Sequence, residues 1–184
     1  MKAIVSFLLF VWEILKIVVM ALAIVIPIRY FLFQPFFVKG QSMEPNFENG
    51  DYLIIDELSY RFSDPKRGDV IVFKYPYNPS QRYIKRIIGL PGEKIEIKNG
   101  LVVVFSEDSS QVLDEKAYLP QGLSTPGIAN VLLGQNEYFV LGDNRPVSSD
   151  SRAWGPLSRQ NIIGKVSLRA WPISAMAKIE IPAY

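Results

Sequence analysis

The chain of 184 residues contains no cysteine and no histidine. The lack of cysteine excludes disulfides, thiol nucleophiles and Cys-ligated metals, and the lack of histidine excludes imidazole as a base, metal ligand or pH switch. The chain also has no long run of basic or acidic residues, and its 20 Lys and Arg against 18 Asp and Glu give a net charge of +2. This charge pattern indicates no nucleic-acid partner. The composition still permits a site for a hard ion made of carboxylates alone, but no EF-hand or P-loop spacing occurs, and we expect no metal site and no cofactor. An enzyme built on this chain must work without His or Cys.

A long apolar segment opens the chain. Residues 3–33 are almost entirely apolar, and Ile17–Ile28 is an unbroken apolar run. As a helix, Ile17–Phe33 would rise about 26 Å, close to the roughly 30 Å thickness of a bilayer's hydrocarbon core. A buried core helix is disfavoured because the run has no polar stripe. A cleavable signal peptide is disfavoured because the small-x-small stretch Ala21-Leu22-Ala23 is followed by more apolar residues. We therefore expect residues 1–34 to hold a single transmembrane anchor, whose orientation the nearly balanced flanking charges leave open.

The remaining residues, 35–184, have the size of one domain and are rich in short β-branched and aromatic segments. Gly, Pro, Asn or Asp bound these segments, which predict strands at 51–56, 69–75, 82–89, 94–98, 101–105, 137–141 and 162–171. Asn99-Gly100 is typical of the type I′ turn of a hairpin. No sustained helical periodicity follows residue 35. We expect a mainly β fold, an antiparallel β domain of the partly closed barrel type, with an irregular insertion at about 106–136.

Four stretches combine turn residues with polar side chains: GQSMEP from Gly40, GDVIVF from Gly68, YIKRIIGLPGE from Tyr83 and GDNRPVSSDSRAWG from Gly142. Each has an ordinary interpretation by itself. Ser42 is typical of a hydrogen-bonding turn, and Lys85 of an edge strand. The charged side chains of the last stretch are typical of a solvated ion-pair loop (Asp143, Arg145, Asp150 and Arg152).

A serine hydrolase without histidine needs another base, and lysine takes this place in Ser-Lys dyads. A free lysine has a pKa near 10.4, so a base that works near pH 7 needs its pKa lowered by roughly three units, or about 4 to 5 kcal/mol. Burial among apolar neighbours lowers a lysine pKa, and Tyr83, Ile84 and Ile87 are such neighbours for Lys85. Spacing alone does not select Lys85 among the lysines.

Together and in order, the anchor and the motifs QPFFVKGQSMEP, GDVIVFKYP, YIKRIIGLPGEKIEI and GDNRPVSSDSRAWGPL resemble the type I signal peptidases, in their smaller Gram-positive-like form. These are membrane-bound Ser-Lys proteases that remove signal peptides from exported proteins. The resemblance implies that Ser42 is the nucleophile and Lys85 the general base, which returns a proton to the leaving amine. It also implies that the Ser42 backbone N–H lies in the oxyanion hole.

The resemblance further implies that Ser148 orients the lysine, and that a set of neighbours braces the site: Asp150, Arg152, Asp143 paired with Arg86, Gly142 and Asn144. Some members have a serine as second oxyanion donor where this chain has Gly40. A glycine there resembles the Gram-positive type, and it leaves the second donor unidentified.

The expected partners are signal peptides of exported preproteins and the lipid bilayer. The resemblance implies a cytoplasmic N-terminus and a β domain on the outer face of the cell membrane. The aromatic residues after the run then lie at the bilayer surface (Tyr30, Phe31, Phe33, Phe36 and Phe37). Signal peptides with small residues at the first and third positions before the cut would dock by strand addition. We expect the docking edges at Phe37, Val38, Lys39 and Gly40 and at Arg82, Tyr83 and Ile84.

Two other functions compete with this one. A self-cleaving Ser-Lys repressor would carry a DNA-binding domain in place of a membrane span. A catalytically silent signal-peptidase-like chaperone for pilus or surface-protein assembly would typically lack a dyad residue, whereas this chain has both Ser42 and Lys85.

Overall fold

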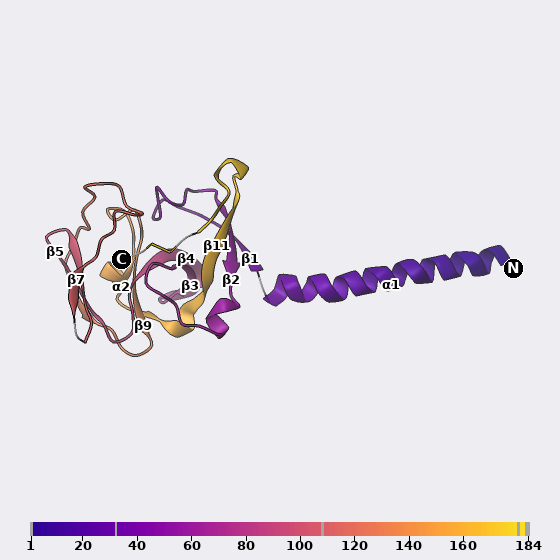
Figure 1. Cartoon of the computed structure of the whole chain (residues 1–184), viewed down its shortest axis with the longest axis horizontal. Coiled ribbons are helices and arrows are strands. Elements are labelled where there is room, and N and C mark those ends of the chain that lie inside the picture. Colours follow the sequence, from indigo (N-terminus) through magenta and orange to yellow (C-terminus); the bar gives the residue numbers. More distant parts are fainter. Residues whose placement is uncertain (1, 32, 108, 180, 183–184) are drawn as a thin grey trace.

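The computed structural model describes residues 2–31, 33–107, 109–179 and 181–182. An N-terminal helix projects from a body made of two antiparallel sheets (Figure 1). The helices are α1 (Lys2–Phe31) and α2 (Ser151–Trp154), with short 3₁₀ turns η1 (Ser59–Arg61), η2 (Arg159–Asn161) and η3 (Ile173–Ala175). The strands are β1 (Phe33–Phe37), β2 (Tyr52–Asp56), β3 (Val70–Tyr75), β4 (Asn78–Gly89), β5 (Lys94–Lys98), β6 (Leu101–Phe105), β7 (Ser110–Val112), β8 (Ala129–Leu132), β9 (Glu137–Leu141), β10 (Leu157–Ser158), β11 (Ile162–Trp171) and β12 (Ala177–Lys178).

Helix α1 contains the predicted apolar segment. Its residues Ile4–Val25 are long and apolar enough to cross a membrane, and none of this stretch is buried against the body. The predicted bounds of the helix, Ile17–Phe33, are wrong at both ends, because the helix begins at Lys2 and Phe33 already pairs with Asp56 of β2. The helix contains two charged residues, Glu13 and Lys16, which form an ion pair of 2.8 Å on one helix face.

The larger sheet has the strand order β1-β2-β11-β3-β4-β9-β10, with β12 paired to β11. All of its pairings are antiparallel, which confirms the mainly β, antiparallel prediction. Every segment predicted to be a strand contains one. Strands β1 and β10 are the two ends of the order, so pairing among the described strands leaves this sheet open.

The smaller sheet, of order β7-β6-β5-β8, is formed by the chain between β4 and β9. Asn99 and Gly100 have φ of 52° and 79°, as the predicted hairpin turn requires. The segment 106–136 is less irregular than we expected, because β7 pairs with β6 and β8 pairs with β5. Residues 113–128 between these two strands contain turns only.

The apolar core fixes the backbone next to both candidate catalytic residues. Met43, directly after Ser42, and Ile84, directly before Lys85, are 1% and 5% exposed and belong to the same core cluster. Burial of each such side chain stabilises the fold by about 1.5 to 3 kcal/mol. The Ser42 turn and β4 are therefore held against one another by packing.

Candidate active site

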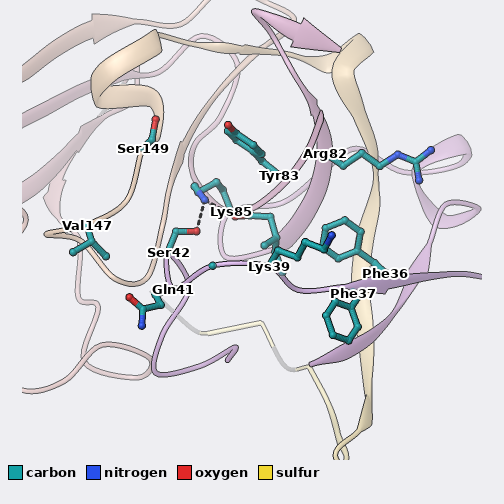
Figure 2. A pocket seen from close by; sticks show the side chains of 12 residues that line it. Phe36, Phe37, Lys39, Gln41, Ser42, Arg82, Tyr83, Lys85, Val147 and Ser149 are labelled. Atoms are coloured by element: carbon teal, nitrogen blue, oxygen red, sulfur yellow. Dashed lines mark hydrogen bonds between the residues drawn. The ribbon is translucent and has the colours of Figure 1, made fainter. Parts of the chain in front are cut away.

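Ser42 and Lys85 meet although 43 residues separate them in the sequence. The Lys85 Nζ lies 2.6 Å from the Ser42 Oγ and donates a second hydrogen bond, of 2.8 Å, to the carbonyl of Ile84 (Figure 2). Lys85 is 3% exposed, whereas Ser42 is only partly buried. The geometry brings an accessible serine hydroxyl next to an almost fully buried lysine amine.

Burial changes the chemistry of this lysine. The loss of hydration lowers the pKa of Lys85 to about 8, while the carboxylates of Asp150 and Asp143 oppose the shift. The apolar neighbours expected from the sequence are present: Ile84 and Ile87 are buried, and the Tyr83 ring centroid lies 5.7 Å from the Nζ. The two carboxylates account for a pKa somewhat above the value near 7 that the chemistry favours.

Asn144 and Gly142 hold the Ser42 turn in place. The Asn144 backbone N–H donates to the carbonyl of Ser42 at 3.1 Å, and its Nδ2 donates to the carbonyl of Gln41 at 3.0 Å. A Cβ on Gly142 would lie 2.2 Å from the Ser148 Oγ and 2.4 Å from the Ser42 carbonyl oxygen. Only glycine permits this close approach of the two loops.

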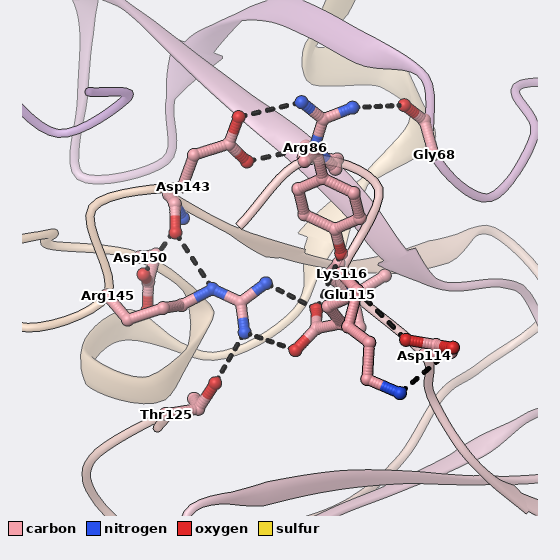
Figure 3. Close-up of polar contacts among 12 residues, drawn as sticks. Gly68, Arg86, Asp114, Glu115, Lys116, Thr125, Asp143, Arg145 and Asp150 are labelled. Carbon is pink, nitrogen blue, oxygen red and sulfur yellow. Dashed lines mark hydrogen bonds and ion pairs between the residues drawn. The ribbon is translucent and has the colours of Figure 1, made fainter. Parts of the chain in front are cut away.

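The Asp143–Arg86 pair joins this loop to β4. Arg86 donates from Nε and Nη2 to the two carboxylate oxygens of Asp143 at 2.9 and 2.7 Å, and from Nη1 to the carbonyl of Gly68 at 3.0 Å (Figure 3). Asn46, four residues after the nucleophile, donates to Asp143 at 2.8 Å. Because Asp143 is fully buried, the loop is a buried ion-pair network, and the ordinary interpretation of it as a solvated loop is wrong.

Arg145 is also fully buried, and no sequence pattern indicates its partners. It donates to Glu115 at 2.8 and 2.5 Å, to Thr125, and to the carbonyl of Gly142 at 3.0 Å (Figure 3). Burial alone would lower the pKa of Arg145, but the hydrogen bonds and charge of Glu115 outweigh it and raise that pKa. The turn-rich part of the insertion thus buttresses the catalytic loop.

Asp150 and Arg152 form the third buried pair. Asp150 accepts from the Arg152 Nε and Nη2 at 2.8 and 2.7 Å and from the Gly142 N–H at 3.1 Å. Arg152 also donates to the carbonyls of Arg145 and Ser148 at 2.7 and 3.3 Å. The acids around the dyad are therefore matched by arginines, and in the described ranges no three His, Cys, Asp or Glu side chains form a metal-binding group.

Ser148 lies in the same loop, but its Oγ is buried without a hydrogen-bond partner in the described part of the chain. The expected hydrogen bond from Ser148 to Lys85 is therefore not formed in this structure. The Ser148 hydroxyl lies beside the Ser42 turn, because a Cβ on Gly142 would contact both the Ser148 Oγ and the Ser42 carbonyl oxygen.

A cleft of about 460 Å³ opens over the dyad (Figure 2). It is lined by the expected edge residues Phe37, Lys39, Gly40, Arg82, Tyr83 and Ile84. Phe36, which was expected at the bilayer surface, also lines it, as do Gln41, Val147 and Ser149, for which no role was expected. Val38 is the exception among the edge residues, because its side chain is 2% exposed and packs in the core. Strand β4 pairs with β9 only from Arg86 onward, so its edge at Arg82–Lys85 has no partner among the described strands.

Comparison with known proteins identifies the family. The family model described as signal peptidase, peptidase S26, matches residues 11–171. The chain is 34% identical over 177 residues to the probable signal peptidase I-1 of Synechocystis sp., covering 92% of this chain and 87% of that protein. It is 35% identical over 176 residues to the signal peptidase I of Leptolyngbya laminosa (91% and 83% covered). It is 33% identical over 169 residues to the signal peptidase IB of Staphylococcus aureus (85% and 87% covered). The crystal structure of a signal peptidase I from Enterococcus faecalis V583 is 30% identical, with a TM-score of 0.46, and covers 56% of this chain and 97% of its own. The chain belongs to the signal peptidase I family.

Proposed function

We propose that this chain is a membrane-anchored serine endopeptidase that removes signal peptides from exported preproteins, cutting after a small-x-small motif with a Ser42–Lys85 dyad. The observation that carries the proposal is the 2.6 Å contact between the Ser42 Oγ and the buried Lys85 Nζ at the base of an open cleft. Family membership supports the same reaction.

In the first step, neutral Lys85 accepts the proton of the Ser42 hydroxyl as the Oγ attacks the scissile carbonyl carbon. The resulting ammonium returns that proton to the leaving amine, which leaves an acyl-enzyme on Ser42. Neutral Lys85 then takes a proton from a water molecule as the water oxygen attacks the ester carbonyl carbon. The ester bond breaks, the signal peptide leaves with a free carboxyl group, and the Lys85 ammonium returns the proton to the Ser42 Oγ. With a pKa of about 8, roughly a tenth of the lysine is neutral at pH 7.

We assign the Ser42 backbone N–H to the oxyanion hole, since it has no hydrogen-bond acceptor among the residues that the structure describes. The Gly40 N–H is unsuited as the second donor, because it already donates to the Asn49 Oδ1 at 2.9 Å. We assign the buried, unpartnered hydroxyl of Ser148 to orienting Lys85 once the substrate is bound.

The remaining site residues act by holding the loop. The pairs Asp143–Arg86 and Asp150–Arg152 fix its two ends, and Gly142 and Asn144 press it against the Ser42 turn. None of these residues needs to touch the substrate for this role.

The proposal includes the location and substrate edges of the protein. Residues 1–34 form a single-pass anchor with a cytoplasmic N-terminus, and residues 35–184 form the catalytic domain on the outer face. Phe37 is 52% exposed, as a side chain at the bilayer surface would be, while Phe36 packs partly against the core. The side chains of Tyr30, Phe31 and Phe33 lie outside the described residues. The signal peptide's small-x-small end lies along the free edge of β4 at Arg82–Ile84, and its apolar stretch stays in the bilayer.

The test uses the full chain in detergent with a preprotein, and the mass of the new amino terminus as readout. Wild type is expected to cut after the small-x-small motif. Ser42→Ala and Lys85→Ala are each expected to abolish cleavage, because each removes one partner of the dyad. Lys85→Arg is expected to abolish it too, because a guanidinium group stays protonated at any usable pH. The matched controls Ser174→Ala and Lys98→Arg, at exposed positions, are expected to cleave normally. Substantial turnover by a Ser42 or Lys85 variant would exclude the dyad. No turnover by wild type would favour the silent chaperone.

A further inference from the structure

A second pocket, of about 420 Å³, adjoins the active-site cleft and shares Arg82 with it. We call it the cationic pocket, because its charged lining residues are Arg61, Lys74, Arg82 and Arg159 against the single carboxylate of Glu57. The Arg82 side chain points away from the Ser42–Lys85 pair (Figure 2). The cleft therefore continues past Arg82 into a positively charged site that the hydrolysis itself does not use.

Three of the basic side chains of this pocket, Lys74, Arg82 and Arg159, form no ion pair with the acids that the structure describes. Lys74 and Arg82 stand opposite one another in the register of β3 and β4, and both are exposed. Arg159 donates to the carbonyl of Tyr60 at 2.6 Å and lies over its ring, contacts that leave its charge in place.

The free edge of β4 runs from the dyad to Arg82, the residue that lines both the cleft and the cationic pocket. An extended peptide rises about 3.3 Å per residue, so the three residues from Lys85 to Arg82 span about 10 Å. A substrate paired along this edge, with its cut site at Ser42, reaches Arg82 at about the fourth residue before the cut. The pocket also lies next to the end of α1, because Glu57 follows Asp56, which pairs with Phe33 at the start of β1. A bound signal peptide whose apolar stretch lies in the bilayer therefore passes the cationic pocket.

We propose that the cationic pocket binds an acidic side chain of the substrate at about the fourth to sixth position before the cut. The inference rests on the proposed function and names part of its substrate class: signal peptides with Asp or Glu between the apolar stretch and the small-x-small motif. Lys74 and Arg82 together recognise the carboxylate, and Arg159 adds to the field that attracts it.

The experiment measures kcat/KM for the full chain in neutral phosphatidylcholine vesicles. The substrates are variants of one peptide that has an apolar stretch and an Ala-x-Ala cut site. Each variant carries Glu, Gln or Lys at the fourth, fifth or sixth position before the cut. Glu at the best of these positions is expected to raise kcat/KM about two- to fivefold over Gln, the range that exposed ion pairs give. Lys74→Glu is expected to reverse the order so that Lys is preferred, while the remote control Lys98→Glu keeps it. At about 1 M salt the preference should shrink, since the Debye length falls to about 3 Å.

The outcomes separate this inference from the proposed function. If wild type cuts all the peptides equally well, the cationic pocket does not read the substrate, although the protease assignment stands. If it cuts none of them, the proposed function itself fails. If Lys74→Glu lowers the cleavage of every peptide alike, and only in vesicles that contain phosphatidylglycerol, the occupant is an anionic lipid headgroup and the inference is overturned.

Discussion

Replacing Gly142 by alanine should move the nucleophile. A Cβ at this position would lie 2.2 and 2.6 Å from the Oγ and Cβ of Ser148 and 2.4 Å from the Ser42 carbonyl oxygen. The Ser148 side chain can rotate away, but the carbonyl oxygen belongs to the backbone of Ser42, the proposed nucleophile. Ordinary contact begins at 3.4 Å, so the Ser42 carbonyl must withdraw by about 1 Å.

That displacement acts on the contact between Ser42 and Lys85. The Ser42 Oγ and the Lys85 Nζ are 2.6 Å apart, and a shift of about 1 Å takes them out of hydrogen-bond range. Misplacement of a reacting group by about 1 Å lowers a rate by roughly 10²-fold, or about 2.7 kcal/mol in activation free energy. We expect kcat of Gly142→Ala to fall by about that factor, with a loss in unfolding free energy of about 1 to 3 kcal/mol.

The assay is peptide cleavage at 25 °C, together with thermal unfolding of the same variants in detergent. The matched control is Gly89→Ala, whose Cβ would meet the core side chains of Ile95 and Leu133 at 2.7 Å, away from the dyad. It is expected to lower Tm and keep kcat. A Gly142→Ala variant with kcat within threefold of wild type would refute the argument that this close approach positions Ser42.

Three further predictions concern the lysine and its surroundings. Since the pKa of Lys85 is about 8, kcat/KM should rise about fivefold from pH 7 to 8 and less than about twofold from pH 8 to 9; a flat profile over this range would remove Lys85 as the base. Asp150→Asn should move the rise of kcat/KM to lower pH, because the Asp150 charge raises the pKa of Lys85. Arg152→Gln should move that rise to higher pH, because it leaves the Asp150 charge uncompensated. Shifts of both variants in the same direction would contradict the electrostatic account. Lys85→Met should abolish cleavage and raise the unfolding free energy at pH 7 by about 1 to 3 kcal/mol, a gain measured by urea unfolding that should vanish as the pH approaches 10.5.

The strands could be predicted because their signals are local. Segments such as 94–98 and 101–105 alternate in burial and are joined by a turn whose two residues both need positive φ. The short strands β7 and β8 carry no such signal and form because they pair with β6 and β5. Strand β1 was missed for a similar reason: its apolar residues continue those of α1, and only pairing with β2 separates them.

The candidate site was less accessible to local reasoning. Ser42 and Lys85 were selected through the resemblance of four motifs, since a contact across 43 residues depends on how the sheet is assembled. The burial of Arg145 could not be predicted at all. Its carboxylate partner, Glu115, lies in the turn-rich part of the insertion, where no periodicity indicates which side chains turn inward.

Burial of Lys85 lowers the stability of the folded chain. Its pKa is about 8 in the folded chain and 10.5 as the ordinary value, so between these two pH values the unfolded chain binds more protons and stability rises with pH. Below about pH 8 the whole penalty is present, about 3 kcal/mol. Packing of Met43 and Ile84 beside the dyad is of the same size and offsets it. Arg86 and Arg152 affect the pKa of Lys85. They neutralise Asp143 and Asp150, the two carboxylates that raise this pKa. Without these arginines the carboxylates would favour the ammonium form of Lys85, the form that cannot accept the Ser42 proton.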